Sequence, residues 1–204
     1  MRFVVCAVLG WMCVGWSARG EGEKLTVGEI VLKDAVVMEN WSEAAGREQP
    51  VTGRFEAAVD AGSRAVKAAV IVGNEKVTVD AGGKPVNFQL RPGDFVGSVV
   101  WTSNDSVALV VWNTRGVGLW LRYVLSVTVD AEGGIKHRLV MANQIAGKLS
   151  VLKLIAKEKE GVRARVRVSG DDRKVRYYEA LLDLGALPDF SEKAVGLYGP
   201  KVER

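Results

Sequence analysis

The stretch FVGSVVWTSNDSVALVVW, residues 95–112, decides the fold class of this chain. Two valine-rich runs flank the turn residues Ser103-Asn104-Asp105, an order typical of two antiparallel strands joined by a tight connection. Trp101 and Trp112 each share one face of their strand with valine, so we predict that both indoles lie in a core. The segment therefore predicts a β-hairpin with a packed tryptophan on each strand.

The same alternation of short apolar runs and turn residues extends from this hairpin in both directions. Most connections are roughly two to six residues long, which leaves no room for the crossover helices of a parallel sheet. We therefore predict an all-β protein: an antiparallel, meander-rich β-sandwich or small barrel of roughly 10 to 13 short strands with little helix. The expected strands are Leu25–Lys33, Ala35–Trp41, Gly53–Val59, Ala65–Val72, Lys76–Val79, Pro85–Leu90, Phe95–Thr102, Val107–Trp112, Val117–Val129, Ile135–Ala142, Leu149–Lys157, Val162–Ser169 and Val175–Asp183.

Helix is favoured at two places. Residues 41–47 have the composition of one or two helical turns, and the spacing from Asp189 to Glu192 is that of a capping box ahead of further helix-forming residues. We expect one β-rich domain over residues 21–183, or two smaller β units with a boundary near residue 115. A C-terminal segment, residues 184–204, follows and carries the short helix.

Residues 1–20 have the composition of a secretory signal peptide. Arg2 supplies the positive charge, residues 3–16 are apolar, and small residues follow up to Gly20. Cleavage after Ser17 or after Gly20 fits the small-residue rule, and we favour Gly20 because a charged stretch then begins the mature chain. The apolar run is shorter than the roughly 20 residues that a membrane-spanning helix needs. The sequence thus predicts a secreted or periplasmic protein.

Both cysteines of the chain, Cys6 and Cys13, lie inside this leader. A cysteine-free mature chain excludes disulfides, a thiol nucleophile and a thiolate metal site. The net charge of +4 is distributed unevenly, since residues 148–204 hold thirteen basic and nine acidic residues. Positive charge is therefore concentrated in the last part of the chain.

The most distinctive feature of residues 148–204 is a strand rich in basic residues. Arg163, Arg165 and Arg167 alternate with apolar residues, so their guanidinium groups project from one face. If the neighbouring strands pair with it as a meander, Lys153 and Arg176 extend a cationic face. Such a face suits an anionic envelope component such as an acidic glycan or lipid head group, or a protein partner, whereas export disfavours nucleic acid as the partner. The alternative is a solvated outer face whose charges prevent edge-to-edge aggregation.

Two further residues are candidates for contact or chemistry. Trp120 lies on the more polar face of its expected strand, which suits stacking against a ligand. His137 is the single histidine and could act as a base, but no serine-nucleophile, zinc-protease, phosphate-loop or dinucleotide motif accompanies it. We therefore predict no catalytic residue, no metal and no cofactor.

The sequence of one segment bears on where in the cell the protein is located. Residues 66–111, with the turn Leu90–Gly97 and the sequence Asp105-Ser106-Val107, are similar to a periplasmic β domain of type II secretion and type IV pilus assembly proteins. The similarity covers under a quarter of the chain and assigns no family. Together these features predict an exported, non-catalytic β domain with a binding or structural role in the cell envelope or extracellular space. The alternative is a hydrolase that acts on an extracytoplasmic polymer through carboxylates or His137.

Overall fold

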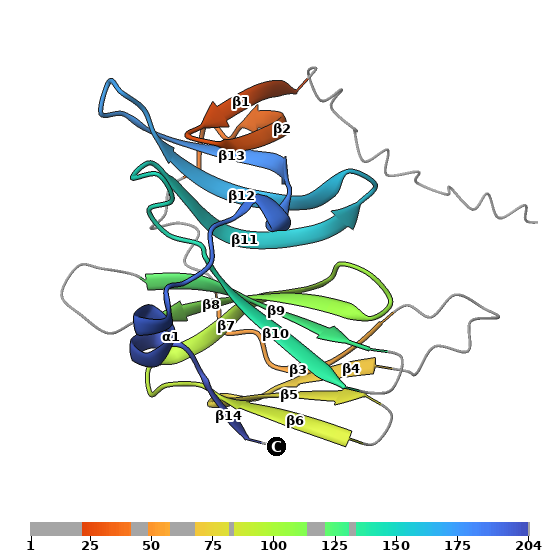
Figure 1. Ribbon diagram of the computed structural model, residues 1–204. Helices are drawn as coiled ribbons and strands as arrows, with labels where there is room; N and C mark the ends of the chain where they lie inside the picture. Colours follow the sequence, from red (N-terminus) through yellow and green to blue (C-terminus); the bar gives the residue numbers. More distant parts are fainter. Residues whose placement is uncertain are drawn as a thin grey trace, which may run out of the picture.

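A computed structural model describes residues 22–41, 49–57, 68–81, 84–113, 121–130 and 134–203. Within these residues the chain forms fourteen strands, one α-helix and one 3-10 turn (Figure 1). The elements are β1 (Glu23–Val27), β2 (Ile30–Val37), β3 (Gly53–Glu56), β4 (Ala68–Val72), β5 (Lys76–Ala81), β6 (Lys84–Gln89), β7 (Asp94–Trp101), β8 (Ser106–Asn113), β9 (Leu121–Val129), β10 (Ile135–Met141), β11 (Leu149–Glu158), β12 (Gly161–Ser169), β13 (Val175–Leu182), η1 (Leu184–Ala186), α1 (Glu192–Tyr198) and β14 (Lys201–Glu203).

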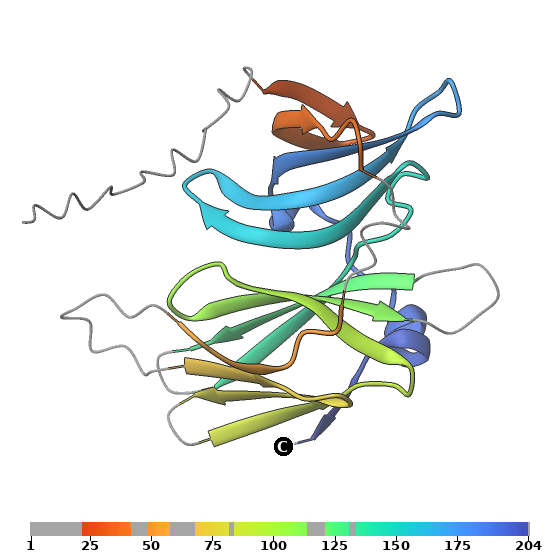
Figure 2. The same ribbon diagram turned by 180° about the vertical axis from the view of Figure 1, so that it is seen from behind.

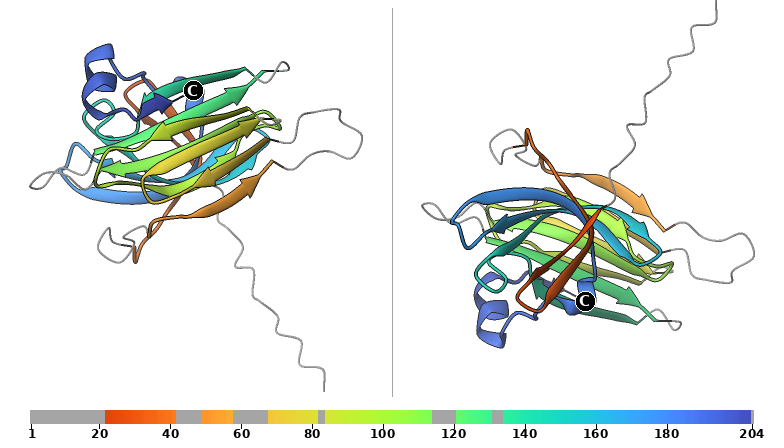
Figure 3. Two further views of the ribbon diagram at one scale, coloured as in Figure 1. Left: turned by 90° about the horizontal axis from the view of Figure 1, so that it is seen from below. Right: turned by 90° about the horizontal axis from the view of Figure 1, so that it is seen from above.

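The strands form three antiparallel sheets that stack as layers (Figures 1 and 3). The upper sheet has the order β1-β2-β13-β12-β11, the middle sheet β10-β9-β8-β7, and the lower sheet β14-β6-β5-β4-β3. One hydrophobic core lies between the upper and middle sheets, and a second lies between the middle and lower sheets. The all-β, antiparallel prediction is confirmed, and the layers are those of a sandwich.

The central strands of the middle sheet, β8 and β9, are buried on both faces, and the sequence explains why. In β8, alternate residues enter different cores: Ala108, Val110 and Trp112 pack toward the upper sheet, whereas Val107, Leu109 and Val111 pack toward the lower sheet. β9 divides its apolar side chains between the two cores in the same way. A strand buried on both sides needs a continuous apolar run, and that is what residues 107–112 supply.

The predicted hairpin of residues 95–112 is present as β7 and β8, paired from Trp101↔Val107 to Asp94↔Asn113. Trp112 is 4% exposed in the upper core, and Trp101 packs against the lower core, so both tryptophans are core residues as predicted. Between β2 and β3 the chain passes the β7 edge of the middle sheet, where the N–H of Val51 donates to the carbonyl of Val96 at 2.8 Å (Figure 2).

Two of the expected strand boundaries are wrong. The first turn falls after Val27, where Gly28 has a φ of 61°, and not near Asp34. Asp34 instead lies inside β2 with a φ of 46°, where the ladder between β2 and β13 is irregular. Strand β14 was not expected, because three residues with a single apolar side chain carry no readable alternation.

Other expectations concern the C-terminal helix and the parts of the chain outside the described residues. The N-cap of α1 is Ser191, whose hydroxyl accepts from the N–H of Ala194, so the cap lies two residues after Asp189. The leader of residues 1–20, the helix expected over residues 41–47 beyond Trp41, and the boundary near residue 115 lie outside the described residues. The strands on either side of that boundary, β8 and β9, pair within one sheet.

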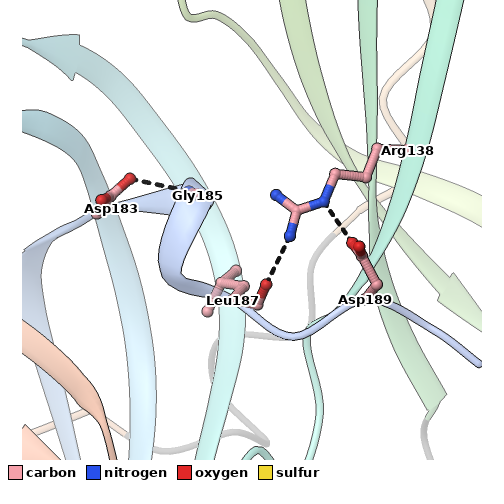
Figure 4. A network of polar contacts seen from close by, with 5 residues as sticks. All are labelled: Arg138, Asp183, Gly185, Leu187 and Asp189. Atoms are coloured by element: carbon pink, nitrogen blue, oxygen red, sulfur yellow. Dashed lines mark hydrogen bonds and ion pairs between the residues drawn. The ribbon is translucent and has the colours of Figure 1, made fainter.

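The C-terminal segment fastens the three sheets together. After β13 it runs beside β10, where the N–H of Met141 donates to the carbonyl of Pro188 and the N–H of Phe190 donates to the carbonyl of Leu139. Arg138 holds this segment with its guanidinium, which donates to the carbonyl of Leu187 at 2.9 Å and pairs with the Asp189 carboxylate (Figure 4). Helix α1 then packs against the lower core, and β14 joins the lower sheet beside β6.

We predict that Gly28→Ala destabilises the fold. The left-handed φ of 61° disfavours any residue with a Cβ, and the added Cβ would stand 2.7 Å from the Cβ of Ala146. The expected loss is about 1–3 kcal/mol in the free energy of unfolding, measured by denaturant titration.

The matched control is Gly196→Ala in α1, where an added Cβ meets nothing within 4 Å. Because alanine is the better helix former, this variant should be unchanged or gain up to about 1 kcal/mol. Equal effects of the two substitutions would contradict the assignment of the β1–β2 turn.

Candidate binding face

The three arginines of β12 lie on the outer face of the upper sheet, away from the core. Their neighbours in β12, which include Val162, Ala164 and Val166, point into the upper core, so alternation places the arginines outside. In the strand register, Lys153 of β11 stands directly opposite Arg165. Arg163 stands opposite Leu181 of β13, and Leu181 stands opposite Lys33 of β2, so Arg163 and Lys33 share one face of the sheet. We call the set Lys33, Lys153, Arg163, Arg165 and Arg167 the cationic face.

Arg163 is a structural member of this face. Its side chain is 9% exposed and makes a two-pronged pair with Glu158, with Nε to Oε1 at 2.7 Å and Nη2 to Oε2 at 3.0 Å. Its Nη1 donates to the carbonyl of Asp34 at 3.2 Å, at the irregular point of β2. The hydrogen bond and charge of Glu158 raise the pKa of the Arg163 guanidinium. The side chain thus fastens β11 and β12 to β2 and offers little of itself to a ligand.

Arg165 is accessible and is held in place by groups on two other segments. Its Nη2 donates to Oε1 of Glu179 on β13 at 3.0 Å, and its side chain keeps 22% of its surface exposed. The guanidinium carbon lies 5.5 Å from the ring centroid of Trp41. A guanidinium at this distance from an indole ring makes a cation–π contact.

Trp41 and Tyr177 bring an aromatic pair to the same face. Their ring centroids are 4.4 Å apart with an interplanar angle of 63°, an edge-to-face contact, and both residues are half-buried. Tyr177 stands directly opposite Arg167 in the ladder between β12 and β13. The face therefore interleaves guanidinium groups with two aromatic rings that also pack against the upper core.

Sequence reasoning did not find these two aromatic residues. Trp41 is far from the arginines in the sequence and reaches them because β2 pairs with β13, a neighbour that becomes evident only in the structure. Tyr177 could have been found from the hairpin register alone, because the turn after Ser169 sets which β13 residue faces Arg167.

Arg176 is not brought together with the other arginines. It stands opposite Val168, whose side chain packs in the upper core, and therefore lies on the other face of the sheet from Arg167. Its guanidinium pairs with the carboxylate of Asp172 at 2.7 Å, and both side chains are more than 40% exposed. This exposed pair lies at the turn between β12 and β13 and not on the cationic face.

The two remaining candidates from the sequence do not join the face. Trp120 lies outside the described residues. His137 is exposed on β10 of the middle sheet, and its ring meets the ring of Phe88 edge-to-face with centroids 5.4 Å apart. The histidine is thus placed over the rim of the lower core, on a different sheet from the arginines.

A pocket of about 280 Å³ opens at one end of the lower sheet. Its lining contains a single carboxylate, and the residues are Glu75, Gln89, Leu90, Arg91, Pro92 and Lys201. Hydrolysis of a glycoside needs two carboxyl groups across the scissile bond, so this pocket does not supply that pair. Within the described parts of the chain, no cluster of three or more histidine, aspartate and glutamate side chains could hold a metal ion.

No helix in the described part of the chain combines the length and the apolar character needed to cross a membrane. No protein-family model, curated protein or solved structure matches this chain. The similarity of residues 66–111 to a secretion-system domain is therefore not joined by a family match.

We predict that Arg163→Gln lowers the free energy of unfolding by about 1–3 kcal/mol, because it leaves Glu158 and the Asp34 carbonyl without their guanidinium donor. Denaturant titration checks this. The matched control is Arg176→Gln, which removes an exposed pair and should leave the midpoint unchanged within error. A stability loss at Arg176 equal to that at Arg163 would show that burial does not distinguish the two arginines.

Proposed function

We propose that this protein is an exported, non-catalytic domain that binds an acidic polysaccharide of the cell envelope or extracellular space through the cationic face. The observation that carries the proposal is the Trp41–Tyr177 pair standing among Arg165 and Arg167. Export is proposed from the signal-peptide composition of residues 1–20.

The chemistry of the face suits such a ligand on two counts. A guanidinium presents a planar fork of N–H donors that matches carboxylate and sulfate oxygens. Aromatic rings offer flat apolar surfaces against which the C–H faces of sugar rings can pack. Arg165 and Trp41 carry one of each group side by side.

The face is also organised before any ligand arrives. Glu179 holds Arg165, Tyr177 holds the ring of Trp41, and the backbone N–H of Met38 donates to the carbonyl of Tyr177 at 2.8 Å. Groups that are fixed in advance lose less conformational entropy on binding than flexible ones. Arginine and tryptophan are also the residues most enriched where binding energy concentrates.

The test is co-sedimentation of the purified protein with polygalacturonate beads, with neutral cellulose as the control polymer, at low and high salt. Binding to the acidic polymer should fall as salt rises, because exposed charges are screened within about 10 Å at 0.1 M ionic strength. Equal pelleting with cellulose, or pelleting that salt does not change, would contradict the proposal.

We predict that Trp41→Ala and Arg167→Ser each weaken this binding by about tenfold, since an aromatic or charge-assisted contact is worth on the order of 1–2 kcal/mol. The matched control is Arg176→Ser, which removes the same charge from the opposite face of the same sheet. Arg163 is left intact because its loss would destabilise the fold, which would confuse the measurement of binding.

A thermal melt of each variant separates loss of binding from loss of fold. If Arg176→Ser weakens binding as much as Arg167→Ser, the interaction depends on overall charge and the proposed face is wrong. Stronger binding to vesicles of phosphatidylglycerol than to polygalacturonate would also overturn it, since the ligand would then be a membrane surface.

A further inference from the structure

Strand β14 leaves one edge of the lower sheet open. Its residues pair with β6 on one side, and no strand among the described residues pairs with its other side. In Figures 1 and 3 the strand runs along the margin of the lower sheet beside the label of the chain end. An open strand edge presents unpaired backbone N–H and C=O groups to any further strand.

The two charged side chains of β14 stand opposite uncharged residues of β6. Lys201 stands opposite Gln89 and Glu203 stands opposite Asn87, so each charge meets a neutral amide. Val202 stands opposite the fully buried Phe88 and yet is 38% exposed. The lysine and the glutamate make no ion pair with the described residues.

Exposed apolar side chains lie close to this strand in the sequence. Leu197 and Tyr198, in the last turn of α1, are 53% and 41% exposed. With Val202 they form three of the seven exposed large hydrophobic residues of the described chain, within six positions of sequence.

The pattern Lys-Val-Glu is complementary to itself in one arrangement. When two copies of β14 pair antiparallel about a two-fold axis through Val202, each Lys201 stands opposite the other copy's Glu203 and valine stands opposite valine. Pairing in parallel and in register would instead set lysine against lysine. The charges therefore select the antiparallel, two-fold pairing.

Two other edge strands, β3 and β10, lack this property. In β3, Arg54 and Glu56 have the same charge order but already pair with each other at 3.0 Å. In β10, Lys136 and Arg138 carry like charges, and the strand is partly covered by the segment around Asp189. Of these three edges, only β14 combines opposite charges without internal partners and exposed apolar neighbours.

We propose that this protein self-associates into a two-fold dimer by antiparallel pairing of β14 with β14 of a second copy. The dimer extends the lower sheet across the two copies and leaves the cationic face of each on the upper sheet. This inference is independent of the proposed function, because it uses the opposite layer of the molecule.

The experiment uses charge reversal and mixing. Lys201→Glu sets glutamate against glutamate in both charge pairs of the dimer, and Glu203→Lys sets lysine against lysine. Each variant should dimerise about tenfold more weakly than the unchanged protein in sedimentation equilibrium. Mixing the two variants in equal amounts should restore the dimer, since each then supplies the charge that the other lacks.

A chain carrying both reversals, Lys201→Glu with Glu203→Lys, keeps the complementarity and should dimerise like the unchanged protein. Folding should persist in all variants because the reversed charges stand opposite the neutral Gln89 and Asn87 in the ladder, and a thermal melt checks this. The inference is overturned if the unchanged protein stays monomeric, if single reversals dimerise normally, or if the mixture fails to associate.

Discussion

Burial of the central strands β8 and β9 on both faces is the constraint on which the rest of this structure depends. Strands β8 and β9 send alternate side chains into an upper and a lower core, so neither outer sheet covers its apolar face without the middle one. The layers are further joined where the hydroxyl of Ser98 on β7 accepts from the buried N–H of Leu154 on β11 at 3.0 Å. Loss of the middle sheet would expose both cores at once.

That constraint also limits where function can lie. With β8 and β9 enclosed, the broad sheet surfaces left to solvent are the outer faces of the upper and lower sheets, together with the exposed part of β10, edges and turns. The upper outer face carries guanidinium groups, a tryptophan and a tyrosine, whereas the lower outer face carries the polar side chains of Thr78 and Asn87 beside the exposed Ile71. A binding role is therefore best placed on the upper sheet, and self-association through β14 leaves it unobstructed.

Much of the fold was predictable from local pattern. Valine-rich runs between turn residues predicted the strands, and alternation placed Trp112 in the core and three arginines on one face. The predictions that failed depend on contacts between strands, which the sequence of a single strand does not reveal. Whether an arginine is structural, as Arg163 is, depends on Glu158 and Asp34 lying within its reach. The contribution of Trp41 depends on β2 pairing with β13, a contact between opposite ends of the sequence.

The central claim, that the cationic face binds an acidic polysaccharide, is tested most directly by nuclear magnetic resonance titration with oligogalacturonate. The indole N–H of Trp41 and the Nε–H signals of Arg165 and Arg167 should shift with the added ligand, while those of Trp101, Trp112 and Arg176 stay in place. Shifts confined to the lower sheet, or shifts at Arg176 as large as those at Arg167, would contradict the account.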